Sequence, residues 1–251
     1  NPHTRGGVYS GDGGESILIA DKAQSEGADR TCLAVPITTG NVLTQPDYIA
    51  NVANNDNCFS FNEMIPGGFT PNFGGNIVDT SLTVGTKGEM DNGVMYDFSG
   101  SIGRNTSSYV IYNTLNASLG AETPRDFEPG KHTQLEKTFN MDFNKDIEVA
   151  MFDSLMVAGG YEWHTESFEV TAGDVASFTA GPYTDQGFGI GSNGFPGFKP
   201  LAAGVFSRQN SAIYVDVEAQ VNEDLLIGTA IRFEDYSTFG SDTNYKITGQ
   251  Y

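Results

Sequence analysis

The feature that most constrains this chain is an alternation of apolar and polar residues that begins near residue 76 and recurs up to the C-terminus. A period of two places successive side chains on opposite faces of a β-strand, so each alternating stretch predicts a strand with one apolar and one polar face. The clearest case is residues 209–221, where Ile213 and Val215 alternate with Tyr214 and Asp216. Strands are predicted at about residues 76–87, 94–102, 132–144, 154–168, 209–221, 225–234 and 245–251.

The connections between these strands differ in length in a regular way. Short turns at 88–93, 145–153 and 222–224 mostly alternate with longer loops at 106–131, 169–208 and 237–243. Outer-membrane barrels have short periplasmic turns and long extracellular loops. The pattern therefore favours an all-β fold of the antiparallel transmembrane β-barrel type. A soluble extracellular β-sandwich, acting as a binding module or a surface-assembly subunit, remains the alternative because its strands alternate too.

Composition excludes two classes of protein. The chain has no run approaching the roughly 20 apolar residues that a membrane helix needs, whereas a barrel strand needs only about 9–11 alternating residues. Its net charge is -19, from 32 acidic and 13 basic residues. Such a surface repels a phosphate backbone, so no nucleic-acid partner is expected.

Residues 1–75 show little period and many turn-forming residues, and we expect an extracellular loop region here. The chain's two cysteines, Cys32 and Cys58, both lie in it. A disulfide between them is the favoured interpretation and implies an oxidising compartment, with two free cytosolic thiols as the alternative. Zinc is not expected at this pair because no histidine or further cysteine is near in sequence.

Several segments of residues 93–251 resemble the barrel of TonB-dependent receptors. The most distinctive are a glycine-rich loop and the strands that follow it. The segments that carry the resemblance are Gly191–Phe198, Ser207–Asn210, Ala212–Glu218, Gly228–Gly240 and Asn113–Gly120 with Pro124 and Phe127–Gly130.

The resemblance implies part of a barrel of about 22 strands in the cell outer membrane, closed by an N-terminal plug. Residues 76–251 would supply strands and loops. The plug, its TonB box and the remaining strands are expected outside this chain, since seven strands are an odd number and bacterial barrels have even ones. The implied function is plug-gated uptake of a scarce nutrient. The implied partners are outer-membrane lipid and lipopolysaccharide, TonB through the plug, and a small-molecule or oligosaccharide ligand.

Ligand contact is predicted in the loops 106–131 and 169–208, with Phe188, Phe195 and Phe198 as the candidate residues. Packing of the loops against one another is the alternative role for these rings. The few positive charges argue weakly against an anionic ferric chelate. An oligosaccharide, a peptide and a metal chelate all remain open as the ligand.

No cofactor, metal or catalytic site is predicted. Gly189–Gly194 matches the pattern GxGxxG but lacks the strand and helix that a dinucleotide site requires. His3, His132 and His164 are far apart, so spacing supports no metal cluster, and a hydrogen-bonded role is expected for His164 on a polar face. No nucleophile motif is present, so we expect a protein that is not an enzyme.

Overall fold

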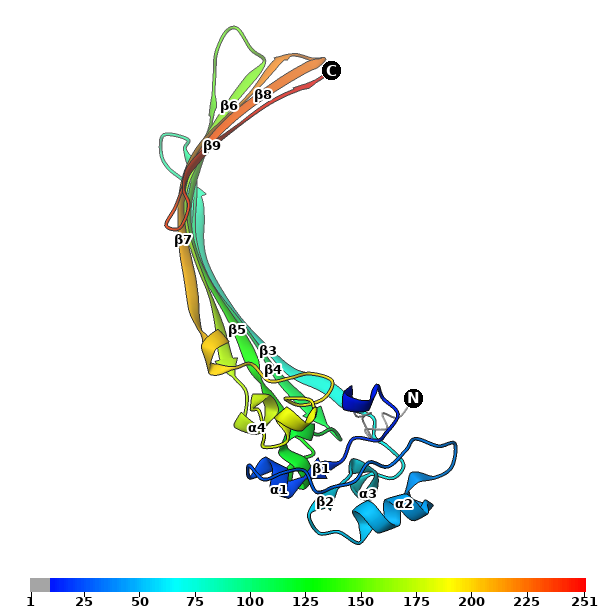
Figure 1. The fold of residues 1–251 in the computed structure, drawn as a ribbon. Coiled ribbons are helices and arrows are strands. Elements are labelled where there is room, and N and C mark those ends of the chain that lie inside the picture. The colour runs from blue at the N-terminus through cyan, green and yellow to red at the C-terminus, as the bar shows by residue number, and fades with distance from the viewer. Residues whose placement is uncertain (1–9) are drawn as a thin grey trace. The chain divides into compact units, whose positions relative to one another are not determined.

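A computed structural model describes residues 10–251, and its long strands form one antiparallel sheet. The strands follow one another in chain order, so each pairs with the next (Figure 1). The seven strands are β3 (Asn72–Glu89), β4 (Met95–Tyr112), β5 (Phe127–Ile147), β6 (Ser154–Ala172), β7 (Gly204–Asn222), β8 (Leu225–Tyr236) and β9 (Gly240–Gln250).

All seven predicted strands are present, and the predicted all-β antiparallel class is confirmed. Most strands are longer than predicted because backbone pairing continues past the last alternating side chain. One prediction was wrong: the expected long loop at 237–243 is a short turn, since β9 already begins at Gly240. The sheet is open in the described part of the chain, with β3 and β9 as its edges.

The register of β7, β8 and β9 gathers the apolar side chains on one face of the sheet. Val215 is paired with Ile231, which is paired with Tyr245 on the other side. Directly paired residues point to the same face. The neighbouring row, Asp216, Ala230 and Lys246, lies on the opposite face. The two faces predicted from alternation are thus aligned across three strands.

The apolar face is exposed over much of its area. Val215 is 49% exposed, Ile231 is 54% exposed and Ile247 is 78% exposed. Large β-branched side chains of a water-soluble sheet are normally covered by a second layer. In residues 10–251 the other sheet is the two-stranded pair β1 (Ala20–Asp21) and β2 (Cys58–Phe59).

The described residues divide into two units. The first unit comprises residues 10–76, 107–132 and 170–204, and the second comprises 77–106, 133–169 and 205–251. The helices are short and belong to the first unit, and no helix of residues 10–251 is long and apolar enough to cross a membrane. The helices are α1 (Lys22–Ser25), α2 (Pro46–Tyr48), α3 (Phe61–Met64) and α4 (Val175–Phe178), with 3-10 turns at Ser10–Asp12, Val42–Thr44, Ala117–Glu122, Thr184–Gln186 and Pro200–Ala202 and a π-helical turn at Ile49–Ala53.

The first unit has a core of its own. One part of this core surrounds the predicted disulfide, Cys32–Cys58, which is confirmed with a Cα–Cα distance of 5.7 Å. Ile19, Val35 and Tyr48 pack around it and are fully or almost fully buried. Residues 10–75 of the region predicted as loops are therefore held by apolar packing and one covalent bond.

Candidate ligand-binding site

Five rings of the first unit lie close together, and we call them the aromatic cluster: Phe73, Tyr109, His132, Phe195 and Phe198. They come from β3, β4, β5 and the loop between β6 and β7. Phe73 lies 4.5 Å from Phe195, and His132 stacks on Phe198 at 4.7 Å between ring centroids. Phe195, Phe198 and His132 are all partly exposed. The cluster offers ring faces for stacking on a ligand.

A polar contact joins two members of the aromatic cluster. The hydroxyl oxygen of Tyr109 lies 3.2 Å from Nδ1 of His132. The two rings meet edge to face, with centroids 5.5 Å apart. The aromatic cluster therefore combines apolar ring faces with a phenol and an imidazole that can exchange hydrogen bonds with a ligand.

The turn that carries Phe195 is anchored to one backbone carbonyl. Ser177 accepts hydrogen bonds at its carbonyl oxygen from the backbone N–H groups of Ser192 and Gly197, both at 2.9 Å. The hydroxyl of Ser192 donates to the carbonyl of Phe195 at 2.6 Å. A Cβ on Gly197 would overlap the Ser177 hydroxyl, so the close approach requires glycine here.

Phe198 is held by the strand ends beside it. Its N–H donates to the carbonyl of Pro129 at 2.8 Å, and its carbonyl accepts from the N–H of Gly173 at 3.1 Å. Pro129 lies in β5, and Gly173 directly follows β6. The loop is therefore bonded to both neighbouring strands at the position of the ring.

Phe188 has a different environment. It is 5% exposed and packs in the core with Phe61 and Leu115, with its ring centroid 5.9 Å from that of Phe61. This is the position of a packing residue, which was the alternative role given to the loop aromatics. Ligand contact stays a prediction for the three loop aromatics, and of these Phe195 and Phe198 are partly exposed while Phe188 is buried.

The loop between β4 and β5, residues 113–126, is held in place by hydrogen bonds of buried polar side chains. The side-chain amide of Asn116 donates to the carbonyls of Ala176 and Thr179, at 2.8 and 2.9 Å. The hydroxyl of Thr114 donates to the carbonyl of Asn193 at 2.6 Å. Because Asn116 and Thr114 are fully buried, loss of these bonds would leave unsatisfied polar groups, which favours one fixed loop arrangement.

Asp21 performs a similar role for the segment around the disulfide. Burial acts to raise the pKa of this carboxyl, but the backbone N–H groups of Cys32, Gln24 and Thr31 and the amide of Asn57 bond to the carboxylate and hold its pKa well below the usual range. The N–H of Cys32 donates to it at 2.7 Å. The charged form of Asp21 therefore stabilises the fold next to Cys32.

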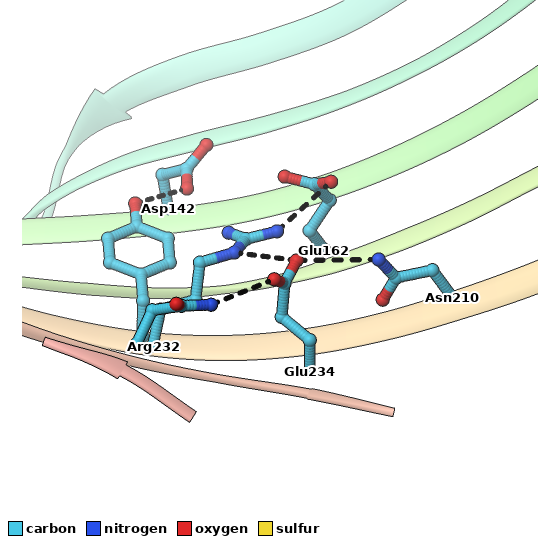
Figure 2. A network of polar contacts seen from close by, with 7 residues as sticks. Asp142, Glu162, Asn210, Arg232 and Glu234 are labelled. Carbon is cyan, nitrogen blue, oxygen red and sulfur yellow. Dashed lines mark hydrogen bonds and ion pairs between the residues drawn. The ribbon is translucent and has the colours of Figure 1, made fainter. Parts of the chain in front are cut away.

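In the second unit the polar face carries a network of charged groups (Figure 2). Arg232 contacts Glu162 at 3.3 Å through Nη2 and Glu234 at 3.0 Å through Nε. Asn210 donates to Glu234 at 3.4 Å. A separate hydrogen bond runs from the hydroxyl of Tyr214 to Asp142 at 2.6 Å. These cross-strand contacts stabilise the register of the polar face and leave it hydrophilic.

The same face contains an open hollow of about 380 Å³ in the second unit. Phe168 and Phe206 line it together with the Glu166–Arg208 ion pair. Position 168 follows Glu166 by two residues, so this ring lies on the face that is otherwise polar. Phe168 and Phe206 are aromatic residues at polar positions of the alternating pattern. They could have indicated this hollow from the sequence, but they were not among the predicted site residues.

The histidines are placed as follows. His132 belongs to the aromatic cluster, and His3 lies outside the described residues. His164 lies on the polar face together with Glu166 and with Glu136 of the neighbouring strand β5. Sequence spacing did not reveal this set because Glu136 and His164 are brought together by strand pairing.

No family model matches this chain, and no curated protein matches it. Among solved structures, the RagAB peptide importer in its 'closed-closed' state is similar with a TM-score of 0.50 and 10% identity over 71% of this chain and 20% of that chain. The fold is that of an outer-membrane β-barrel wall. The siderophore receptor PirA from Acinetobacter baumannii aligns with a TM-score of 0.47 and 15% identity over 70% of this chain. The chain spans 20% and 23% of the length of these two structures.

Proposed function

We propose that this chain forms part of the wall and mouth of a TonB-dependent receptor in the cell outer membrane, which takes up a scarce nutrient by plug-gated active transport. The observation that carries the proposal is the apolar face. Three strands align their apolar rows in register, and these rows are exposed. Lipid is the environment in which such a face is stable while the opposite, charged face lines an aqueous lumen.

The soluble β-sandwich explains this face less well. A sandwich buries the apolar side of one sheet against a second sheet. In residues 10–251 the seven long strands form a single sheet. The barrel-wall fold also supports the membrane proposal. The short pair β1 and β2 is not a second layer for this sheet, because its residues Ala20 and Cys58 are packed in the first unit's own core.

Ligand recognition is assigned to the aromatic cluster. Phe195 and Phe198 are partly exposed and fixed by backbone hydrogen bonds, so a ligand would meet preformed ring faces. An oligosaccharide, a peptide or a metal chelate could stack on them. We propose no catalytic role, and the partners of the whole receptor would be this ligand, TonB and the lipids and lipopolysaccharide around the barrel.

The test is uptake by cells that produce the full-length receptor, with and without TonB. Labelled oligosaccharides, peptides and ferric chelates are supplied separately. We expect saturable uptake of one class, abolished without TonB. Replacing Phe195 and Phe198 by Ala should raise the ligand concentration that gives half-maximal uptake about tenfold, because two stacking faces are lost.

The matched control is Phe239→Ala, an exposed ring of the second unit that stacks on Tyr236 at 4.3 Å and lies outside the aromatic cluster. It should leave uptake unchanged. Uptake that continues without TonB would indicate a passive porin. Recovery of the receptor in the soluble fraction would reject the membrane proposal itself.

A further inference from the structure

Two carboxylates and one imidazole meet on the polar face of the second unit. Glu136 comes from β5, and His164 and Glu166 come from β6. One ligand atom of each residue lies within 4.8 Å of the other two, and all three side chains are partly buried. His164 and Glu166 are two residues apart on one strand, so they necessarily share a face.

Both carboxylates are oriented by neighbours outside this trio. The amide of Gln134 donates to Oε1 of Glu136 at 2.7 Å. The guanidinium of Arg208 forms an ion pair with Oε1 of Glu166. Each carboxylate has a second oxygen that these contacts do not use. Hydrogen bonds of this kind orient the ligands of known metal sites.

We propose that Glu136, His164 and Glu166 bind one divalent transition-metal cation, with Zn²⁺ as the representative ion. A mixed nitrogen and oxygen ligand set suits Zn²⁺ and its neighbours, whereas Ca²⁺ and Mg²⁺ prefer oxygen alone. Tetrahedral Zn²⁺ places its ligand atoms about 3.4 Å apart. The three ligand atoms are separated by at most 4.8 Å, and side-chain rotation that shortens these separations would bring them to that spacing.

Three protein ligands leave a fourth position of tetrahedral zinc open to water or to a donor group of a passing molecule. The site differs from a plain acidic patch in its imidazole, which contributes affinity for transition metals but little for Ca²⁺. Arg208 opposes the bound cation through its positive charge. Removing that charge should therefore strengthen binding, while removing the imidazole should weaken it.

The experiment is calorimetric titration of Zn²⁺ into the full-length protein, purified in detergent and first treated with a chelator. We expect one site per chain. His164→Gln and Glu136→Gln should each weaken it at least tenfold, and Arg208→Gln should strengthen it. The control Glu218→Gln removes an exposed carboxylate from the same face outside the trio and should leave the affinity unchanged.

An excess of Ca²⁺ should not displace the bound Zn²⁺. Zinc affinity that is unchanged in His164→Gln, equal competition by Ca²⁺, or no binding by the wild-type protein would each overturn the proposal. A damaged fold could weaken zinc binding but would not strengthen it. Stronger zinc binding by Arg208→Gln would therefore show that substitutions at this site act on the bound cation and not on the fold. The measurement needs no transport, and its outcome is independent of the proposed uptake role.

Discussion

At the scale of single residues, Asp21 shows how one charge can organise a loop region. Both of its carboxylate oxygens act only as acceptors, and the side chain is 0% exposed. Asp21→Asn replaces one oxygen by an NH₂ group that faces backbone N–H donors. We expect a loss of about 2 kcal/mol, seen as about 30-fold faster hydrogen exchange around Cys32 and Cys58 by mass spectrometry.

Asp12→Asn is the control, because the N–H groups of Gly14 and Glu15 both donate to Oδ1 of Asp12, and the amide oxygen of Asn can keep these two bonds. Exchange around the disulfide should stay at the wild-type rate. If both variants behave alike, the bonds to Asp21 do not stabilise this segment.

The lowered pKa of Asp21 also gives a pH dependence with a definite sign. Its folded-state pKa lies below the unfolded value of about 3.9. Its contribution to stability is therefore complete above about pH 5 and is lost progressively as the pH falls through the unfolded-state value toward the folded-state pKa. The exchange rates of wild type and Asp21→Asn should approach each other at acidic pH.

At the scale of one strand, the two faces of β7 should respond differently to the same new charge. Val215→Lys places an ammonium group in the apolar row beside Ile231. In a lipid-facing row this should cost about 2–4 kcal/mol near the bilayer midplane and less toward the interfaces. Urea unfolding in phospholipid vesicles measures the difference.

Glu218→Lys introduces the same ammonium group three residues away on the polar face, where Glu218 is paired with Gly228. Its effect on the unfolding free energy should be small, because the side chain stays in water. A cost equal to that of Val215→Lys would mean that the face assignment of β7 is wrong.

At the scale of the whole molecule, the exposed apolar rows predict a requirement for lipid or detergent. Many large apolar side chains of the second unit, including Ile231 and Ile247, are more than half exposed. A contiguous apolar surface of this kind drives association in water. We expect the full-length protein to sediment as one species in detergent and to aggregate when detergent is removed. A single monodisperse species in plain buffer would favour the soluble β-sandwich.

Much of the fold could be predicted because local chemistry decides it. The alternation around Val215 specifies two strand faces, and Cys32 and Cys58 in a polar loop region predict their disulfide. The extents of the strands were underestimated. Backbone N–H and C=O groups continue to pair in β4 and β5 after the side-chain pattern has ended. β9 likewise begins at Gly240, inside the loop that was predicted at 237–243.

The sequence by itself determined which segments become strands and which of their faces are apolar, because these depend on neighbours along the chain. It favoured the disulfide, which the structure then confirmed. The tertiary structure alone decided that Phe188 is packed in the core while Phe195 and Phe198 join the aromatic cluster, although all three are rings in one loop. It also decided that Glu136 meets His164 and Glu166. These contacts depend on loop packing and on strand register, which are set by the summed interactions of residues far apart in the chain.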